Sequence, residues 1–203
     1  MTIEEYIDQN LELLEKLCGK KDTWKGENYD KIMMNVKVNY DIVVNNMKSA
    51  EYLTPIESSF ESHIRPFWKK ELGVEKPKED EVVIMEFAWH GETGQYLKIG
   101  RDGFIYNAVN NEGEKINLNS YANPSPIKSD ETQLLVDKVF NAVKDARECP
   151  KVYYLDGTEH IFAAYIDGKV KLGKVYCPRV ESNMGKLLKE IQDTLGIEQL
   201  IHI

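Results

Sequence analysis

The chain has 203 residues, of which 42% are hydrophobic, and it carries a formal net charge of −8 from 26 basic and 34 acidic side chains. This composition is ordinary for a packed globule, and it excludes disorder for most of the chain. The acidic surplus disfavours nonspecific binding to DNA, RNA or an anionic membrane, because such partners need a basic footprint.

Cysteine content and hydropathy bear on the cellular compartment. The three cysteines, Cys18, Cys149 and Cys177, are too few and too widely spaced for a disulfide framework, which fits a reducing compartment. The first residues lack the basic and apolar regions of a signal peptide. No stretch approaches the roughly 18 consecutive apolar residues of a membrane span. We therefore expect a cytoplasmic protein that does not enter a membrane.

The amino-terminal part of the sequence is predicted to be helical. Residues 2–18 carry apolar side chains at helical spacing, Thr2 and Glu5 have the spacing of a capping box, and Gly19 stands where a C-terminal cap would lie. Residues 29–49 fit both an alternating strand and a helical stripe. Length favours the helix, because strands rarely exceed about ten residues.

A further helix is expected to start at Thr54, since threonine can cap, Pro55 is tolerated at the first helical position and Glu57 can complete a capping box. We expect it to bend or break just before Pro66. Residues 75–81 hold a proline and six charges, which is typical of a linker. The sequence thus predicts a helical region over 1–74 and a linker over 75–81.

Residues 82–203 have the pattern of two antiparallel β-meanders, each followed by a helix. Three Asp-Gly pairs between apolar runs predict tight hairpin turns: Asp102-Gly103, Asp156-Gly157 and Asp167-Gly168. The first meander is expected over 82–89, 96–99, 104–109 and 115–118, and its helix starts at Ser129. The second is expected over 152–155, 160–166 and 169–176, and its helix covers 182–195. Residues 197–203 could add a short edge strand.

This order of elements predicts an α+β fold. The simplest packing joins the two meanders into one mixed or antiparallel sheet with helices on one face. The helical region and the sheet region can then pack as a single domain.

Two polar turns are the candidates for chemistry. His90 and Glu92 lie in a glycine-rich turn, where His90 could act as a base near neutral pH. Asp156 and His160 repeat that mixture in the second meander. A site would need the two turns to meet in space, while ordinary turn chemistry already explains the Asp and Gly residues.

Other catalytic classes lack sequence support. There is no Cys-x-x-Cys and no pair of histidines at i, i+4, so no metal site is predicted, and no cofactor is expected. There is also no Gly-x-Ser-x-Gly. Cys177 is the better candidate for a reactive thiol because Arg179 is near.

The leading hypothesis is a non-enzymatic, acidic interaction protein that binds a protein partner, with a basic partner the best match for its charge, as an immunity-type or regulatory protein would. Aromatic and arginine side chains are frequent contact anchors, and the nominees are Trp24, Trp68, Trp89 and Arg179. The alternative is a small hydrolase or metal-assisted enzyme using His90, Glu92 and His160. A third option is self-association through the carboxy-terminal edge strand.

Overall fold

The computed structural model describes residues 1–64, 72–88, 93–110, 129–148 and 158–197. The chain divides into two compact units, Met1–Asn46 and Met47–Ile203. The expected linker, residues 75–81, lies within the second unit. None of the helices in the described ranges is long and apolar enough to cross a bilayer.

The first unit is helical, as expected. Its elements are α1 (Ile3–Gln9), α2 (Leu11–Cys18), a 3-10 turn η1 (Lys21–Thr23) and most of α3 (Gly26–Ser49). The capping box at the start of α1 is confirmed: the hydroxyl of Thr2 accepts from the backbone N–H of Glu5, and the backbone N–H of Thr2 donates to the Glu5 carboxylate at 2.7 Å. The helix predicted over 29–49 is also confirmed, and it begins three residues earlier.

The single helix expected over 2–18 is instead two helices that meet at Asn10. This residue leaves helical geometry, with φ −111° and ψ 13°. Its side-chain amide donates to the carbonyl of Tyr6 at 2.8 Å, a local bond that competes with continuation of the helix. A side-chain competitor of this kind leaves the apolar periodicity unchanged, so the periodic pattern alone did not reveal the break.

The first unit has its own apolar core, formed by side chains from the three helices and the turn between them. The members are Tyr6, Ile7, Leu14, Trp24, Ile32 and Val36. The indole N–H of Trp24 donates to the carbonyl of Gly19 at 2.7 Å, so this buried ring also closes the turn between α2 and α3. Trp24 is therefore a packing residue.

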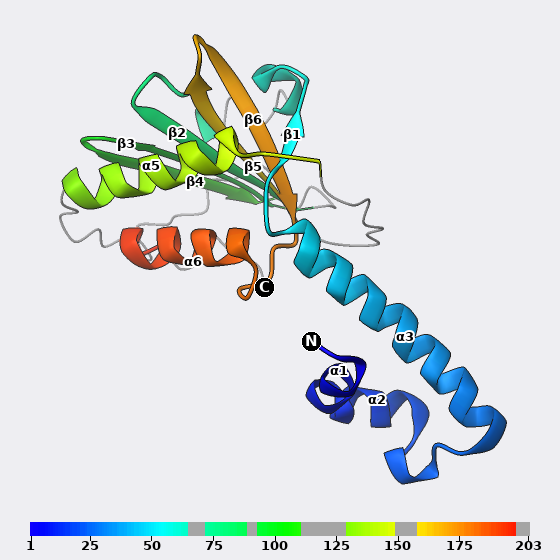
Figure 1. The fold of residues 1–203 in the computed structure, drawn as a ribbon. Coiled ribbons are helices and arrows are strands. Elements are labelled where there is room, and N and C mark those ends of the chain that lie inside the picture. Colours follow the sequence, from blue (N-terminus) through cyan, green and yellow to red (C-terminus); the bar gives the residue numbers. More distant parts are fainter. Residues whose placement is uncertain (65–71, 89–92, 111–128, 149–157, 198–203) are drawn as a thin grey trace. The chain divides into compact units, whose positions relative to one another are not determined.

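In the described residues, the second unit is built on a six-stranded antiparallel sheet with the order β1-β6-β5-β2-β3-β4 (Figure 1). Its strands are β1 (Thr54–Ile56), β2 (Glu81–Ala88), β3 (Thr93–Gly100), β4 (Gly103–Asn110), β5 (Thr158–Ile166) and β6 (Lys169–Tyr176). Pairing of β2 with β5 joins the two meanders into one sheet, which confirms the α+β class.

The two faces of the sheet are covered differently. Helices α5 (Ser129–Lys144) and α6 (Asn183–Leu195) lie on the same face (Figure 1), where Leu135 and Leu188 pack against Val82 and Ile84 of β2. The opposite face packs against Phe60, within the 3-10 helix η2 (Phe60–His63), and against neighbouring segments. Because side chains alternate along a strand, β2 serves both cores.

The prediction of a helix that starts at Thr54 is wrong, because residues 54–56 form the edge strand β1. Pro55 lies opposite Gly173 of β6, and a proline is tolerated on an edge strand because its missing N–H removes no central ladder bond. Gly173 is required there, since a Cβ at that position would lie 2.8 Å from the Cβ of Leu53. The local Thr-Pro signal for a helix is therefore overridden by nonlocal pairing.

Two of the three predicted hairpin turns lie in the described residues, and both are confirmed, one of them with a shift of one residue. Asp167 and Gly168 have positive φ angles of 55° and 79°, as the Asp-Gly pair predicts. Between β3 and β4, Gly100 pairs with Gly103, so the two turn residues are Arg101 and Asp102, one position earlier than expected. The turn at 156–157 and the strands predicted over 115–118 and 152–155 lie outside the described residues, as does most of 197–203.

Candidate functional site

The structure describes only part of the candidate set predicted from the sequence. Trp68, Trp89, His90 and Glu92 lie outside the described residues, as does Asp156. His160 lies in β5 and is completely buried. Arg179 follows β6 and is exposed. The constellation of His90, Glu92 and His160 therefore remains a hypothesis, with only its last member placed.

His160 belongs to a row of polar side chains that crosses the helix-covered face of the sheet. We call Glu86, Gln95, Tyr106 and His160 the polar row. Glu86 of β2 pairs with His160 of β5 on one side and with Gln95 of β3 on the other. Tyr106 of β4 completes the row, because its hydroxyl donates to Gln95 Oε1 at 2.5 Å.

The centre of the polar row is an acid–base pair within the protein interior. Glu86 Oε2 lies 3.5 Å from His160 Nε2, and neither side chain has exposed surface. Glu86 follows Val82 and Ile84 at a spacing of two along β2, so the pair continues the apolar face that α5 and α6 cover. Sequence reasoning missed Glu86, Gln95 and Tyr106, because each looked like one polar residue in an alternating strand.

Glu86 contributes to a raised pKa at two neighbouring groups, Tyr106 and Cys177. Burial raises the pKa of the Tyr106 phenol, and the Glu86 carboxylate raises it further. Burial also raises the pKa of the Cys177 thiol; the Thr158 N–H, which donates to Cys177 Sγ at 3.2 Å, opposes this, and Glu86 adds to it. A raised pKa keeps the thiol protonated at neutral pH, so the expectation of a reactive Cys177 is not supported.

The polar row is suited to holding the sheet together more than to reacting with a substrate. Its imidazole and carboxylate are both sealed from solvent in the described structure. Within the described ranges, no group of three or more His, Cys, Asp or Glu side chains is arranged to hold a metal ion. The row contains the Tyr106–Gln95 hydrogen bond and the Glu86–His160 pair, and buried polar contacts between neighbouring strands favour one packing of a core.

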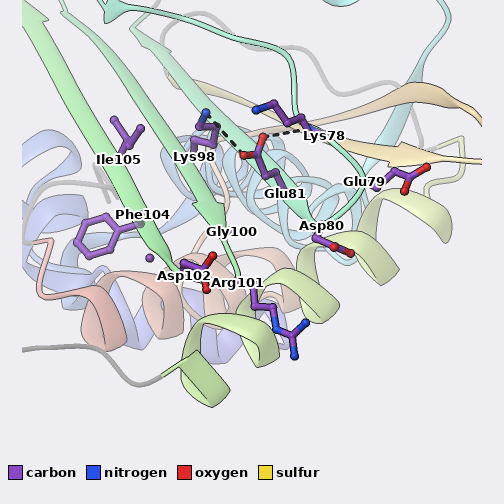
Figure 2. A pocket seen from close by; sticks show the side chains of 11 residues that line it. Lys78, Glu79, Asp80, Glu81, Lys98, Gly100, Arg101, Asp102, Phe104 and Ile105 are labelled. Atoms are coloured by element: carbon purple, nitrogen blue, oxygen red, sulfur yellow. Dashed lines mark hydrogen bonds and ion pairs between the residues drawn. The ribbon is translucent and has the colours of Figure 1, made fainter.

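A hollow of about 580 Å³ lies near the other end of the same strands, around the β3–β4 turn (Figure 2). Lys98 is held there between two carboxylates, 3.0 Å from Glu75 and 3.8 Å from Glu81, and Figure 2 shows Lys98 and Glu81 pointing toward each other. The lining charges are of both signs: Lys78, Lys98 and Arg101 against Glu79, Asp80, Glu81 and Asp102. Because the charges offset one another, the hollow has no preference for an anion or a cation.

A third feature lies on α3. Seven exposed residues share one side of this helix, and we call them the outer face of α3: Lys31, Met34, Asn35, Val38, Asp41, Ile42 and Asn45. Its three apolar members, Met34, Val38 and Ile42, are spaced by four residues and are 64%, 54% and 38% exposed. Residues four apart are neighbours on a helix, so they form one continuous stripe.

The outer face of α3 is distinct from the face that builds the core of the first unit. Ile32 and Val36 point into that core, and Tyr40 packs against it. The sequence contained the signal for a second stripe, since Met34, Val38 and Ile42 belong, together with Val36 and Tyr40, to the alternation that made 29–49 resemble a strand. Because the segment is a helix, Met34, Val38 and Ile42 lie on a different side from the residues that form the core of the first unit.

Comparisons with protein-family models, with curated proteins and with solved structures find no match for this chain.

Proposed function

We propose that the chain is a non-enzymatic interaction protein and that it binds a protein partner on the outer face of α3. The exposed stripe of Met34, Val38 and Ile42 carries this proposal. Folded chains expose single apolar residues freely, but a continuous apolar stripe with a polar rim is typical of a protein–protein contact. Apolar residues repeated one turn apart are also the anchors that a helix presents to a partner's groove.

The charge pattern supports a protein partner over a nucleic acid or a membrane surface. The outer face of α3 contains one cation, Lys31, and one anion, Asp41, so the contact itself is nearly neutral. The net charge of −8 on the whole chain would repel polyanions such as nucleic acids and anionic membranes. The sparse cysteines support a cytoplasmic setting for this encounter.

The alternative, an enzyme that uses His90, Glu92 and His160, has less support. Catalysis requires the imidazole to come within hydrogen-bond reach of a substrate proton. His160 has no exposed surface and already faces Glu86. An exposed apolar stripe, in contrast, needs no rearrangement to bind.

Affinity capture with two matched variants tests the proposal. Val38→Glu places a charge in the middle of the stripe, and Leu134→Glu makes the same change at an equally exposed position (52%) on α5. From a lysate of the source organism, the native chain and L134E should recover the same partner in near-stoichiometric amount. V38E should recover at least about tenfold less, because a buried unpaired charge is costly. Equal recovery by V38E would overturn the proposal.

A further inference from the structure

We infer that the partner on the outer face of α3 is a second copy of this chain, docked antiparallel with Val38 at the two-fold axis. This inference rests on the proposed function and names the partner for the same surface. A two-fold contact requires one patch to complement itself, so that residue i meets residue j and residue j meets residue i. The residues of the outer face meet this requirement in chemistry as well as in spacing.

The apolar residues match across such an axis. Met34 lies four residues before Val38, and Ile42 lies four residues after it. In an antiparallel pair, Met34 of each copy therefore meets Ile42 of the other, and Val38 meets Val38. All three positions are exposed in a single chain, so they are free to pack in this way.

The polar residues of the face discriminate between the two possible directions. Lys31 and Asn45 lie at equal distances along the sequence before and after Val38. Asn35 and Asp41 also lie at equal distances before and after it. Antiparallel docking therefore places Lys31 opposite Asn45 and Asp41 opposite Asn35. Parallel docking would place Lys31 on Lys31 and Asp41 on Asp41, and such like-charge contacts are unfavourable.

Antiparallel docking also offers an attractive charge pair. Asp41 lies one helical turn from Asn45, so the long side chain of Lys31 can reach Asp41 of the second copy. The pair occurs twice, once on each side of the axis. The charges on this face therefore favour one orientation of one partner, namely the chain itself reversed.

The size of the face sets the strength of the contact. Residues 31–45 extend over about 22 Å of helix, and each copy contributes three apolar side chains. A contact of this extent lies at the small end of specific interfaces, so we expect a dissociation constant on the order of 10 µM. The association would then respond to protein concentration.

Sedimentation velocity of the full chain tests self-association over a range from roughly 1 µM to several hundred µM. The native chain and L134E should shift from monomer to dimer with rising concentration, whereas V38E should remain a monomer. A native chain that is monomeric throughout would overturn the inference, and so would a V38E dimer of unchanged strength. If the native chain is monomeric and V38E still loses a captured protein, this inference fails while the proposed function stands. If capture is also unchanged, both fail.

Cysteine cross-linking tests the direction of the helices, on a background in which the three native cysteines are replaced by serine. A mixture of Met34→Cys and Ile42→Cys chains should form a disulfide-linked heterodimer, because the antiparallel register brings these positions together. M34C alone should not cross-link, because its two copies would be about 12 Å apart along the helices, too far for a disulfide. Efficient cross-linking of M34C to itself, with none to I42C, would overturn the antiparallel arrangement.

Discussion

Glu86 and His160 face each other across β2 and β5, with Glu86 Oε2 3.5 Å from His160 Nε2 and no exposed surface on either side chain. This pair joins the two meanders at the strand pairing that unites the sheet. Moving two polar groups out of water is costly, and their attraction only partly offsets that cost. Loss of one partner should therefore be far more damaging than the net contribution of the pair suggests.

Glu86→Ala should lower the free energy of unfolding by about 3–5 kcal/mol, because it leaves the His160 imidazole in the interior without its carboxylate. His160→Ala should have a similar effect. The double variant should be more stable than the sum of the two losses predicts, with a coupling of roughly 0.5–3 kcal/mol. Urea unfolding of the four proteins measures this coupling. Strictly additive losses would show that the two side chains do not act as a pair.

Tyr106 should make stability fall at alkaline pH. Its pKa is raised in the folded state, by burial and by Glu86, so the folded chain keeps a proton that the unfolded chain releases near its ordinary value of 10.0. The contribution of the protonated Tyr106 phenol to the free energy of unfolding is complete below about pH 10 and is lost as the pH rises further. Tyr106→Phe cannot titrate, so its deficit in unfolding free energy relative to the native chain should shrink between pH 8 and pH 11.

Urea unfolding at these two pH values measures that change, with Tyr29→Phe as the control for loss of a hydroxyl at an exposed position. At pH 8, Y106F should be less stable by about 1 kcal/mol, because Gln95 loses its hydrogen-bond donor. A deficit that stays constant or grows with pH would contradict the role assigned to the phenol.

Gly185 should tolerate no side chain. A Cβ at this position would lie 1.8 Å from the carbonyl oxygen of Arg179, and that oxygen already accepts hydrogen bonds from the backbone N–H and the hydroxyl of Ser182. Backbone atoms held in this way cannot move aside cheaply. Gly185→Ala should therefore destabilise by about 1–3 kcal/mol despite the better helix propensity of alanine.

Thermal unfolding measures this effect, and Lys186→Ala provides a matched change at the next residue of α6, which is exposed. K186A should unfold within a degree or two of the native chain, since exposed substitutions are usually within about 0.5 kcal/mol. G185A and K186A with equal melting temperatures would show that the turn before α6 is looser than the structure indicates.

Local chemistry predicted most of the elements of this chain. The capping box at Thr2, the turn at Asp167-Gly168 and the helix over 182–195 are each specified by a few neighbouring residues, and each is confirmed. The two predictions of secondary structure that failed did so because of nonlocal strand pairing or a side-chain hydrogen bond. Thr54 and Pro55 carry a good helix signal, but pairing with β6 makes them a strand. Asn10 breaks a helix through one side-chain hydrogen bond.

The polar row could not be predicted, because it depends on which strands become neighbours. Glu86 and His160 belong to different meanders, and only the pairing of β2 with β5 places them opposite each other. The sequence indicated more of the outer face of α3 than of the polar row. The sequence predicted the helix over 29–49, and the exposure of Met34, Val38 and Ile42 follows from the packing of the opposite side of that helix against the core of the first unit.

The claim that the outer face of α3 binds protein is tested most directly by a photo-cross-linking amino acid at position 38 of the full chain, with a matched sample carrying it at position 134. We predict a specific adduct from position 38 in the source organism and none from position 134, and the adduct should have the mass of two copies of this chain. The absence of any adduct at position 38, or equal labelling from both positions, would contradict the account.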